Sequence, residues 1–323
     1  LKQGGLFAPV SREGAMVFNN LFLTAACATV FIGTLYPLAL EALTGEKISV
    51  GAPFFNLTFG PLFVPLLLAV PFGPLLAWKR GDLLGVAQRL MGAAALAFVG
   101  IAATFAIMGA KAILAPFMIG LAVYVMAGAL TDIVERTGLF RSPFSSSMSR
   151  ARGLPRSAWG TAIAHFGLGV TLLGIVCETN WSSERIVVVK PNDVVSISSY
   201  ELIFQGLTQR QGPNYRELTA RFVVKSGGSD VGVLEPSKRT FATRAMSTTE
   251  AALLTRGVSQ LYLSLGDLNA DGSMAIRLYH KPLVLLIWLG AVVMMLGGLL
   301  SLSDRRLRVG APKPARAALQ PAE

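Results

Sequence analysis

Long apolar segments recur along the chain, and shorter polar segments separate most of them. A helix needs about 20 largely apolar residues to cross a bilayer. Six segments come close to or exceed that length, at residues 15–43, 57–78, 90–109, 113–134, 157–177 and 282–302. The pattern predicts a polytopic α-helical membrane protein with six transmembrane helices. Pro37 predicts a kink in the first helix, and four prolines in the second predict a broken helix beside a cavity (Pro61, Pro65, Pro71 and Pro74).

Between the fifth and sixth apolar segments the chain is mixed and polar. Short runs with strand-like alternation lie at residues 185–190, 194–199, 215–224, 260–265 and 274–279. Asn269 to Gly272 is typical of a turn that joins two strands into a hairpin. The sequence therefore predicts a small β-rich domain, of sandwich or barrel type, before the last helix.

Composition supports the membrane assignment. Hydrophobic residues make up 53% of the chain and charged residues 15%, and the mean hydropathy is +0.56. The net charge of +11 does not indicate nucleic-acid binding, because Lys and Arg fall mainly in the gaps between apolar segments, where they report topology. Five arginines lie between residues 135 and 156, which predicts a cytoplasmic loop.

That loop fixes the rest of the predicted topology. Residues 1–179 form five helices with a cytoplasmic N-terminus, residues 180–281 form a periplasmic β-rich domain, residues 282–303 form the last helix, and residues 304–323 form a basic cytoplasmic tail. The protein is then a multi-pass protein of the bacterial inner membrane, in contact with its lipids. Because the chain starts at Leu1 without a secretory leader pattern, we expect it to be part of a longer protein.

Familiar short chemical motifs are missing from the sequence. Cys27 and Cys177 lie far apart in apolar segments, without zinc or C-x-x-C spacing, and are expected to be unpaired thiols. There is no phosphate loop, no H-E-x-x-H and no serine-hydrolase elbow. The catalytic residues are therefore unknown from the sequence.

One histidine, His165, lies inside an apolar segment. An ionisable side chain at membrane depth is costly and usually faces a bundle interior, a cavity or a cofactor. On a helix its neighbours are Thr161, Ala162, Leu168 and Gly169, three of which are small. Such a face suits a flat macrocycle beside an axial imidazole, and it suits tight packing of two helices equally well. The residues alone leave both interpretations open.

Three weaker patterns have simple structural interpretations. Ser11 is a candidate helix N-cap with Glu13 in the first turn, and capping alone could explain both. Asp132 and Arg136 are spaced for an ion pair on one helix. His280 precedes the last helix and is a weak ligand candidate, since a histidine at a membrane interface is usually solvated or hydrogen-bonded.

Several long stretches, taken in order, resemble one family. They are FAPVSREGAMVFNNLFL, GTLYPLALEALTGEKISVGAPFFN, AHFGLGVTLLGI, TEAALLTRGVSQLYLSLGD and RLYHKPLVLLIWLGAVVMMLGGLLSLSDRR. Together they are similar to the C-terminal half of the CcmF family, with the related CycK and Ccl1 proteins. These are haem lyase membrane proteins of the system I pathway of cytochrome c maturation.

The resemblance implies that His165 is an axial ligand to the iron of a haem b within the membrane. The other axial ligand, a tryptophan-rich segment and the external histidines belong to the family's N-terminal half and are not in this sequence. The four tryptophans here are scattered and form no such segment (Trp78, Trp159, Trp181 and Trp288). The family pattern has tyrosine where this chain has His280, which argues against a shared ligand role.

The resemblance also implies a function. The chain would be part of a haem lyase that attaches haem to the C-x-x-C-H motif of apocytochrome c, and its haem b would reduce the incoming haem. Expected partners are a periplasmic haem chaperone, apocytochrome c, other maturation subunits and quinol. Two alternatives are a transporter for haem or another hydrophobic ligand, and an assembly scaffold without a redox role.

Overall fold

Six helices within the described part of the chain are long and apolar enough to span a membrane. The computed structural model describes residues 7–109, 113–241 and 244–304. Within it are two compact units, one inside residues 1–170 and 290–323 and the other at residues 171–289. The predicted six-helix membrane protein with a β domain before its last helix is confirmed. The predicted basic tail, apart from Asp304, lies outside the described residues.

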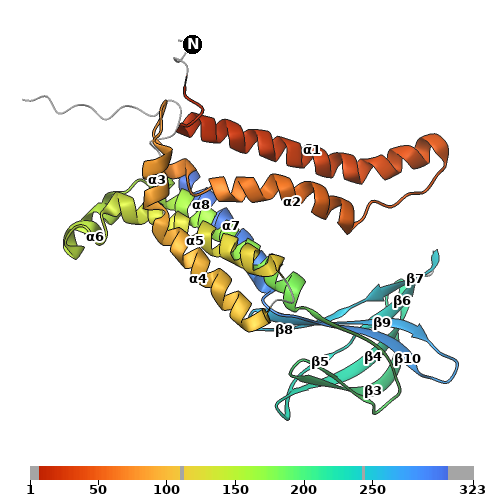
Figure 1. The fold of residues 1–323 in the computed structure, drawn as a ribbon. Coiled ribbons are helices and arrows are strands. Elements are labelled where there is room, and N and C mark those ends of the chain that lie inside the picture. The colour runs from red at the N-terminus through yellow and green to blue at the C-terminus, as the bar shows by residue number, and fades with distance from the viewer. Residues whose placement is uncertain (1–6, 110–112, 242–243, 305–323) are drawn as a thin grey trace, which may run out of the picture. The chain divides into compact units, whose positions relative to one another are not determined.

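The described helices are of two kinds, long spanning helices and short elements in the connections between them. The spanning helices are α1 (Arg12–Thr44), α2 (Ala52–Ala69), α4 (Met91–Met108), α5 (Leu114–Thr137), α7 (Arg156–Trp181) and α8 (Leu285–Leu302). The short elements are η1 (Gly73–Leu75), α3 (Leu83–Arg89) and α6 (Phe144–Gly153). Figure 1 labels α1 to α8. The sequence did not predict α3 or α6.

Proline shapes the first two spans in different ways. Helix α1 continues through Pro37, and Figure 1 shows its axis bending toward its C-terminal end. The second span is broken, as the sequence predicted, but its bounds differ from the predicted segment 57–78. It begins at Ala52, α2 ends at Ala69, and the chain resumes in η1. Pro71 lies in that break because its ring cannot continue the hydrogen-bonded ladder of the helix.

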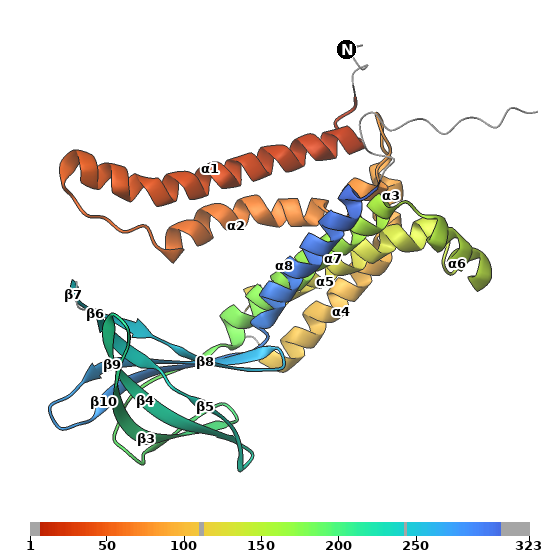
Figure 2. The same ribbon diagram turned by 180° about the vertical axis from the view of Figure 1, so that it is seen from behind.

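Small residues bring the spanning helices close together. A side-chain carbon at Gly120 of α5 would lie 3.1 Å from the backbone oxygen of Ala97 on α4. A side-chain carbon at Gly297 of α8 would lie 2.5 Å from the backbone nitrogen of Ala164 on α7. Figure 2 shows α8 running beside α7. Close backbone approach at glycine is typical of helix pairs in membranes.

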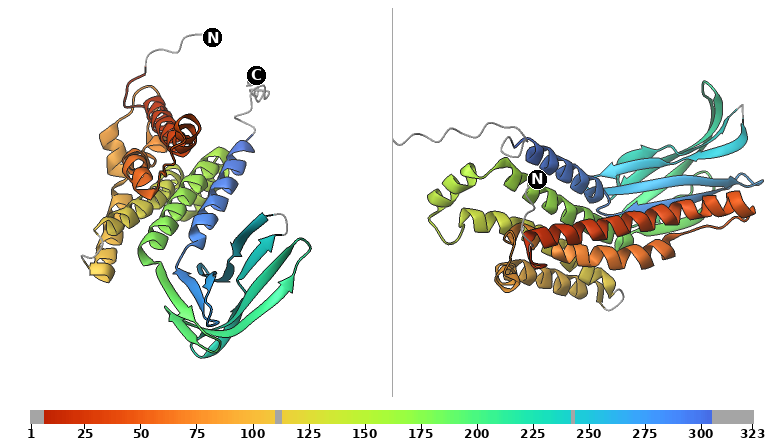
Figure 3. Two further views of the ribbon diagram at one scale, coloured as in Figure 1. Left: turned by 90° about the vertical axis from the view of Figure 1, so that its right-hand side faces the viewer. Right: turned by 90° about the horizontal axis from the view of Figure 1, so that it is seen from above.

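Two antiparallel sheets make up most of the second unit. One sheet has the order β1-β10-β9-β8 and the other the order β2-β3-β4-β6-β7, with β5 also paired to β4. The left-hand view of Figure 3 shows the strands of this unit. The strands are β1 (Ser183–Val189), β2 (Val194–Ile197), β3 (Tyr200–Gln211), β4 (Tyr215–Ser226), β5 (Ser229–Leu234), β6 (Ser237–Phe241), β7 (Arg244–Glu250), β8 (Ala252–Arg256), β9 (Ser259–Leu268) and β10 (Met274–Lys281).

The two sheets share one apolar core. Phe204 and Phe222 are fully buried, and their stacked rings have centroids 4.8 Å apart. Alternate residues of the other sheet, such as Leu263, Ile276 and Leu278, belong to the same cluster. A β-sandwich, one of the two predicted types, is therefore the architecture of this unit.

The predicted hairpin turn is present. Strands β9 and β10 pair antiparallel, and Gly272 takes a positive φ of 78° in the turn between them. The side chain of Asp271 accepts hydrogen bonds from the backbone N–H and hydroxyl of Ser273, and these bonds lower the pKa of the carboxyl group. The turn is therefore closed by its own side chains.

The first and last strands of the sandwich lie next to each other. Strand β1, which follows α7, pairs directly with β10, which precedes α8. Lys281 forms an ion pair with Glu178 at 2.8 Å, and the hydroxyl of Thr171 donates to the backbone oxygen of Ile287 at 3.4 Å. The chain therefore enters and leaves the sandwich through one pair of strands.

Candidate functional site

The face of α7 that carries His165 differs from its two packed faces. Gly160 and Gly167 lie against α8, where a side-chain carbon at either would come within 2.5–2.7 Å of backbone atoms. Ala162 is buried, and a side-chain carbon at Gly169 would lie 2.9 Å from the backbone oxygen of Ala122 on α5. His165 and Thr161 instead line a cavity. The packing interpretation therefore holds for Gly169, one of the small neighbours of His165, whereas the imidazole faces open space.

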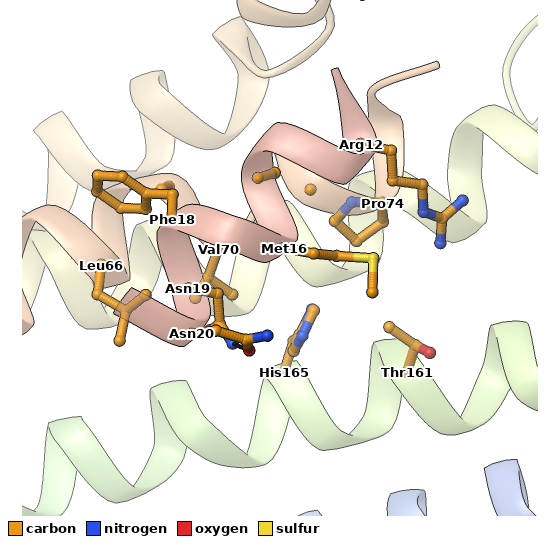
Figure 4. A pocket seen from close by; sticks show the side chains of 13 residues that line it. Arg12, Met16, Phe18, Asn19, Asn20, Leu66, Val70, Pro74, Thr161 and His165 are labelled. Carbon is orange, nitrogen blue, oxygen red and sulfur yellow. Dashed lines mark hydrogen bonds between the residues drawn. The ribbon is translucent and has the colours of Figure 1, made fainter. Parts of the chain in front are cut away.

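The cavity beside His165 has a volume of 310 Å³. Pockets for small molecules range from about 300 to 1,000 Å³, so it lies at the small end of that range. Residues from α1, α2, the segment after α2 and α7 surround it (Arg12, Ala15, Met16, Phe18, Asn19, Asn20, Leu66, Ala69, Val70, Gly73, Pro74, Thr161 and His165). Figure 4 shows the imidazole directed from α7 toward Met16, Asn19 and Asn20 of α1.

The imidazole of His165 is half-buried and has no hydrogen-bond partner within the described part of the chain. The nearby amides of Asn19 and Asn20 bond to each other at 3.3 Å. Asp132 on α5 lies within electrostatic range of His165, but this carboxylate, only 3% exposed, is already paired with Arg136 at 2.8 Å. The predicted Asp132–Arg136 pair is confirmed. The nitrogens of His165 are left available to a ligand in the cavity.

A positive charge lies at one end of the cavity. The guanidinium carbon of Arg12 is 5.1 Å from the centre of the Trp78 ring, and in Figure 4 Arg12 stands at the opposite end from Leu66 and Phe18. Among the described residues that line the cavity, Arg12 is the one with a permanent charge. The cavity therefore suits a ligand with an apolar body and an anionic end.

The start of α1 is fixed to the segment after η1. Ser11 caps α1 by accepting a hydrogen bond from the N–H of Gly14 at 3.0 Å, so the predicted N-cap is confirmed. Glu13 lies in the first turn of α1, and its carboxylate also accepts a hydrogen bond from the backbone N–H of Lys79 at 2.7 Å. The N–H of Arg12 also donates to Ala77. These bonds hold Arg12 at the end of the cavity.

Replacing Ser11 by Ala removes this cap. We expect the substitution to cost about 1 kcal/mol, as for other lost N-caps, and to increase amide hydrogen exchange at Gly14 and Ala15. Ser11→Thr keeps a capping oxygen and is the matched control. Equal exchange rates in the Ala and Thr variants would contradict a capping role.

His280 is not among the described residues that line the cavity. It lies on β10 and is half-buried, with its ring centroid 5.7 Å from that of Tyr200. Burial lowers the pKa of His280. Its role as a ligand stays a weak prediction, and its contacts are those of a side chain packed in the sandwich.

The lowered pKa of His280 gives the sandwich a pH dependence. Below a pH of about 6.5 the unfolded chain binds this proton more readily than the folded chain, so stability falls as the pH drops. We expect protection of the β10 amides from hydrogen exchange to decrease between pH 7.5 and 5.5. In His280→Gln, which does not titrate, the decrease is expected to be smaller. An unchanged decrease in this variant would contradict the assignment.

The donor set in the cavity fits a haem that takes one axial ligand from this chain. The described residues contain no group of three or more His, Cys, Asp and Glu side chains able to hold a metal. A haem needs from the protein only axial ligands, an apolar setting and partners for its carboxylates. In this cavity His165 can supply an axial ligand, the lining supplies the apolar setting, and Arg12 can pair with a haem carboxylate. The sequence motifs alone could not show that Arg12 and Asn19 line the same cavity as His165.

Comparisons with known proteins agree with this architecture. The family described as CcmF C-terminal beta-sandwich matches residues 180–282. The cytochrome c-type biogenesis protein CycK of Bradyrhizobium diazoefficiens is 66% identical over all of this chain and 49% of its own length. The cytochrome c-type biogenesis protein CcmF of Pseudomonas aeruginosa is 35% identical over 97% of this chain and 47% of its own length. The chain thus spans about half the length of these relatives.

A solved structure shows the same fold. The structure named cytochrome c heme lyase CcmF superposes with a TM-score of 0.71 at 24% identity, covering 92% of this chain and 46% of that one. The resemblance seen in the sequence motifs is thereby confirmed along almost the whole chain. The chain is therefore similar, along almost its whole length, to the C-terminal half of CcmF-type cytochrome c-type biogenesis proteins, and residues 180–282 match the family described as CcmF C-terminal beta-sandwich.

Proposed function

We propose that this chain is part of a haem lyase for c-type cytochromes and that His165 is an axial ligand of a haem b within the membrane. Relatives named as cytochrome c-type biogenesis proteins match the chain from end to end. The observation that carries the proposal is the imidazole of His165, which faces an apolar cavity and has no hydrogen-bond partner among the described residues. A neutral imidazole in such a setting is a good iron ligand.

The surrounding residues have separate tasks in this proposal. Close packing of α7 at Gly160 and Gly169 fixes the backbone that carries the imidazole. Arg12 offers a positive charge to a carboxylate of the porphyrin, and the apolar side chains of α1 and α2 exclude water. Asn19 and Asn20 offer hydrogen-bond donors and acceptors near the imidazole. The second axial ligand would come from outside this chain.

When bound, this haem b supplies one-electron chemistry that keeps a second, incoming haem reduced. The vinyl groups of the incoming haem are joined to the two thiols of an apocytochrome C-x-x-C-H motif. The proposed partners are a periplasmic haem chaperone, apocytochrome c, other maturation subunits and quinol.

We also propose an orientation for the chain in the bacterial inner membrane. Arginines gather between α5 and α7 (Arg141, Arg150, Arg152 and Arg156), which favours the cytoplasmic side for this loop. The β-sandwich, at residues 180–281, is then periplasmic, as it joins the opposite ends of α7 and α8. Residues 1–179 and 282–303 span the membrane, and residues 304–323 are cytoplasmic.

The absorbance spectrum of the protein purified from its own membrane tests the proposal. We expect the reduced spectrum of a b-type haem, and a pyridine haemochrome assay that gives a non-covalent haem. A colourless protein that still supports cytochrome c maturation would contradict the haem assignment and favour a scaffold. A colourless protein that moves haem across the membrane of proteoliposomes would favour a transporter. The broken second span also fits that class of protein.

A further inference from the structure

Helix α6 connects two spanning helices and is itself too short and too polar to span. It has ten residues, FSSSMSRARG, between the end of α5 at Thr137 and the start of α7 at Arg156. A crossing helix needs about 20 apolar residues. Because α5 and α7 are both candidate spans, α6 has to lie at the membrane surface where they end.

One side of α6 is held against α5. Ser147 is buried, and its hydroxyl donates to the backbone oxygen of Gly138 at 3.4 Å. The guanidinium of Arg150 donates to the hydroxyl of Ser142 at 3.1 Å and to the backbone oxygen of Thr137 at 3.5 Å. These contacts fix the rotation of α6 about its own axis, so its remaining sides have defined directions.

A neighbouring side of α6 is apolar and exposed. Phe144 is 69% exposed and Met148 38% exposed, and they lie one turn apart on the same face. Phe140, in the turn before the helix, is 89% exposed. Exposed aromatic residues at the end of spanning helices are suited to the boundary between headgroups and acyl chains. The indole N–H of Trp159, which donates to the backbone oxygen of Ala151 at 3.3 Å, adds an aromatic ring at the end of α6.

Two arginines at the junction of α6 and α7 lack acidic partners within the described residues. Arg141 is paired with Glu135 at 3.1 Å, but Arg152 and Arg156 are exposed and form no ion pair within that part of the chain. Both line a cavity of 570 Å³ at the junction of α6 and α7. Asp304 also lines this cavity, and its carboxylate accepts the backbone N–H of Ser157 at 3.0 Å. The cavity therefore has a net positive lining.

We propose that α6 lies flat in the membrane interface and binds an anionic phospholipid. The phosphate of the lipid lies in the cavity between Arg152 and Arg156, and its acyl chains lie along Phe144 and Met148. Guanidinium groups bind phosphate oxygens well, and basic residues beside spanning helices attract anionic lipids. The apolar side chains near the start of α6 and the basic side chains at its junction with α7 match the two parts of a lipid. The inference does not depend on haem binding at His165.

Photo-cross-linking from two positions of α6 tests the apolar contact in the protein as it exists in its membrane. p-Benzoylphenylalanine in place of Phe144 is expected to give a phospholipid adduct, identified by its mass. The same cross-linker in place of Ser146, which lies on another side of the helix, is expected to give little or none. A protein adduct from position 144, or equal lipid adducts from both positions, would overturn the proposal.

Native mass spectrometry with added phosphatidylglycerol tests the basic contact. Arg152→Gln with Arg156→Gln is expected to weaken binding of this lipid by about 30-fold, while binding of phosphatidylcholine is unchanged. Arg216→Gln with Arg256→Gln removes the same charge from exposed positions of β4 and β8 and is the matched control. Equal phosphatidylglycerol affinity in the two double variants would overturn the proposal.

Discussion

His165→Ala is expected to abolish the b-type haem spectrum of the purified protein and, with it, cytochrome c maturation. Loss of a residue that merely supports a metal ligand lowers affinity by about 10- to 100-fold, and loss of the ligand itself is expected to exceed that. The cavity beside His165 remains in the variant, because all but one of its other lining residues come from α1, α2 and the segment after α2. Added imidazole can therefore enter it and restore part of the spectrum.

Two control variants make the His165 result specific. Thr161→Val changes the other α7 side chain of the cavity without removing a ligand, and His280→Ala removes the second histidine of the chain. Both are expected to keep a normal haem spectrum. If His165→Ala binds haem with an unchanged spectrum, His165 is not a ligand. If all three variants lose haem, the loss reflects folding.

Gly297→Leu is expected to separate α8 from α7. A side-chain carbon at this position would lie 2.5 Å from the backbone nitrogen of Ala164 and 2.6 Å from the backbone oxygen of Gly160. Backbone atoms cannot move aside by changing rotamer, so the helices have to shift. Overpacking costs about 1–3 kcal/mol in well-packed cores. Because Ala164 precedes His165, we expect lower haem content as well as a lower thermal unfolding temperature.

The next residue provides the control for Gly297. No described atom lies within 4 Å of a side-chain carbon placed at Gly298, apart from its own helix and chain neighbours. Gly298→Leu therefore adds the same side chain without a clash, and its thermal unfolding temperature and haem content are expected to match those of the wild type. Similar losses in the two variants would show that the close contact between α7 and α8 is not what stabilises this pair.

The sequence predicts the helices of this protein better than its strands. Membrane spans are long and almost uniformly apolar, so each is visible without knowledge of its neighbours. Strand β3 was missed because a register shift between Phe204 and Gly206 interrupts its pairing with β4, and such a bulge breaks the two-residue alternation. Helix α6 was missed because its serines and arginines give no long apolar period.

The cavity could be predicted only in part. His165 was identified because a histidine is conspicuous in an apolar segment. The side chains opposite it, Asn19 and Arg12, lie about 150 positions earlier in the sequence, and only the packing of α1 and α2 onto α7 brings them to the same cavity. The small residues around His165 could not be assigned from spacing alone, because packing and ligand binding favour the same residue types.

The pairing of β1 with β10 means that the sandwich has its two ends side by side, at the ends of two helices that are themselves in contact. A domain attached in this way can lengthen its other loops, or be replaced by another of the same kind, without pulling those helices apart. The surface of the sandwich can thus change while the membrane helices keep their geometry.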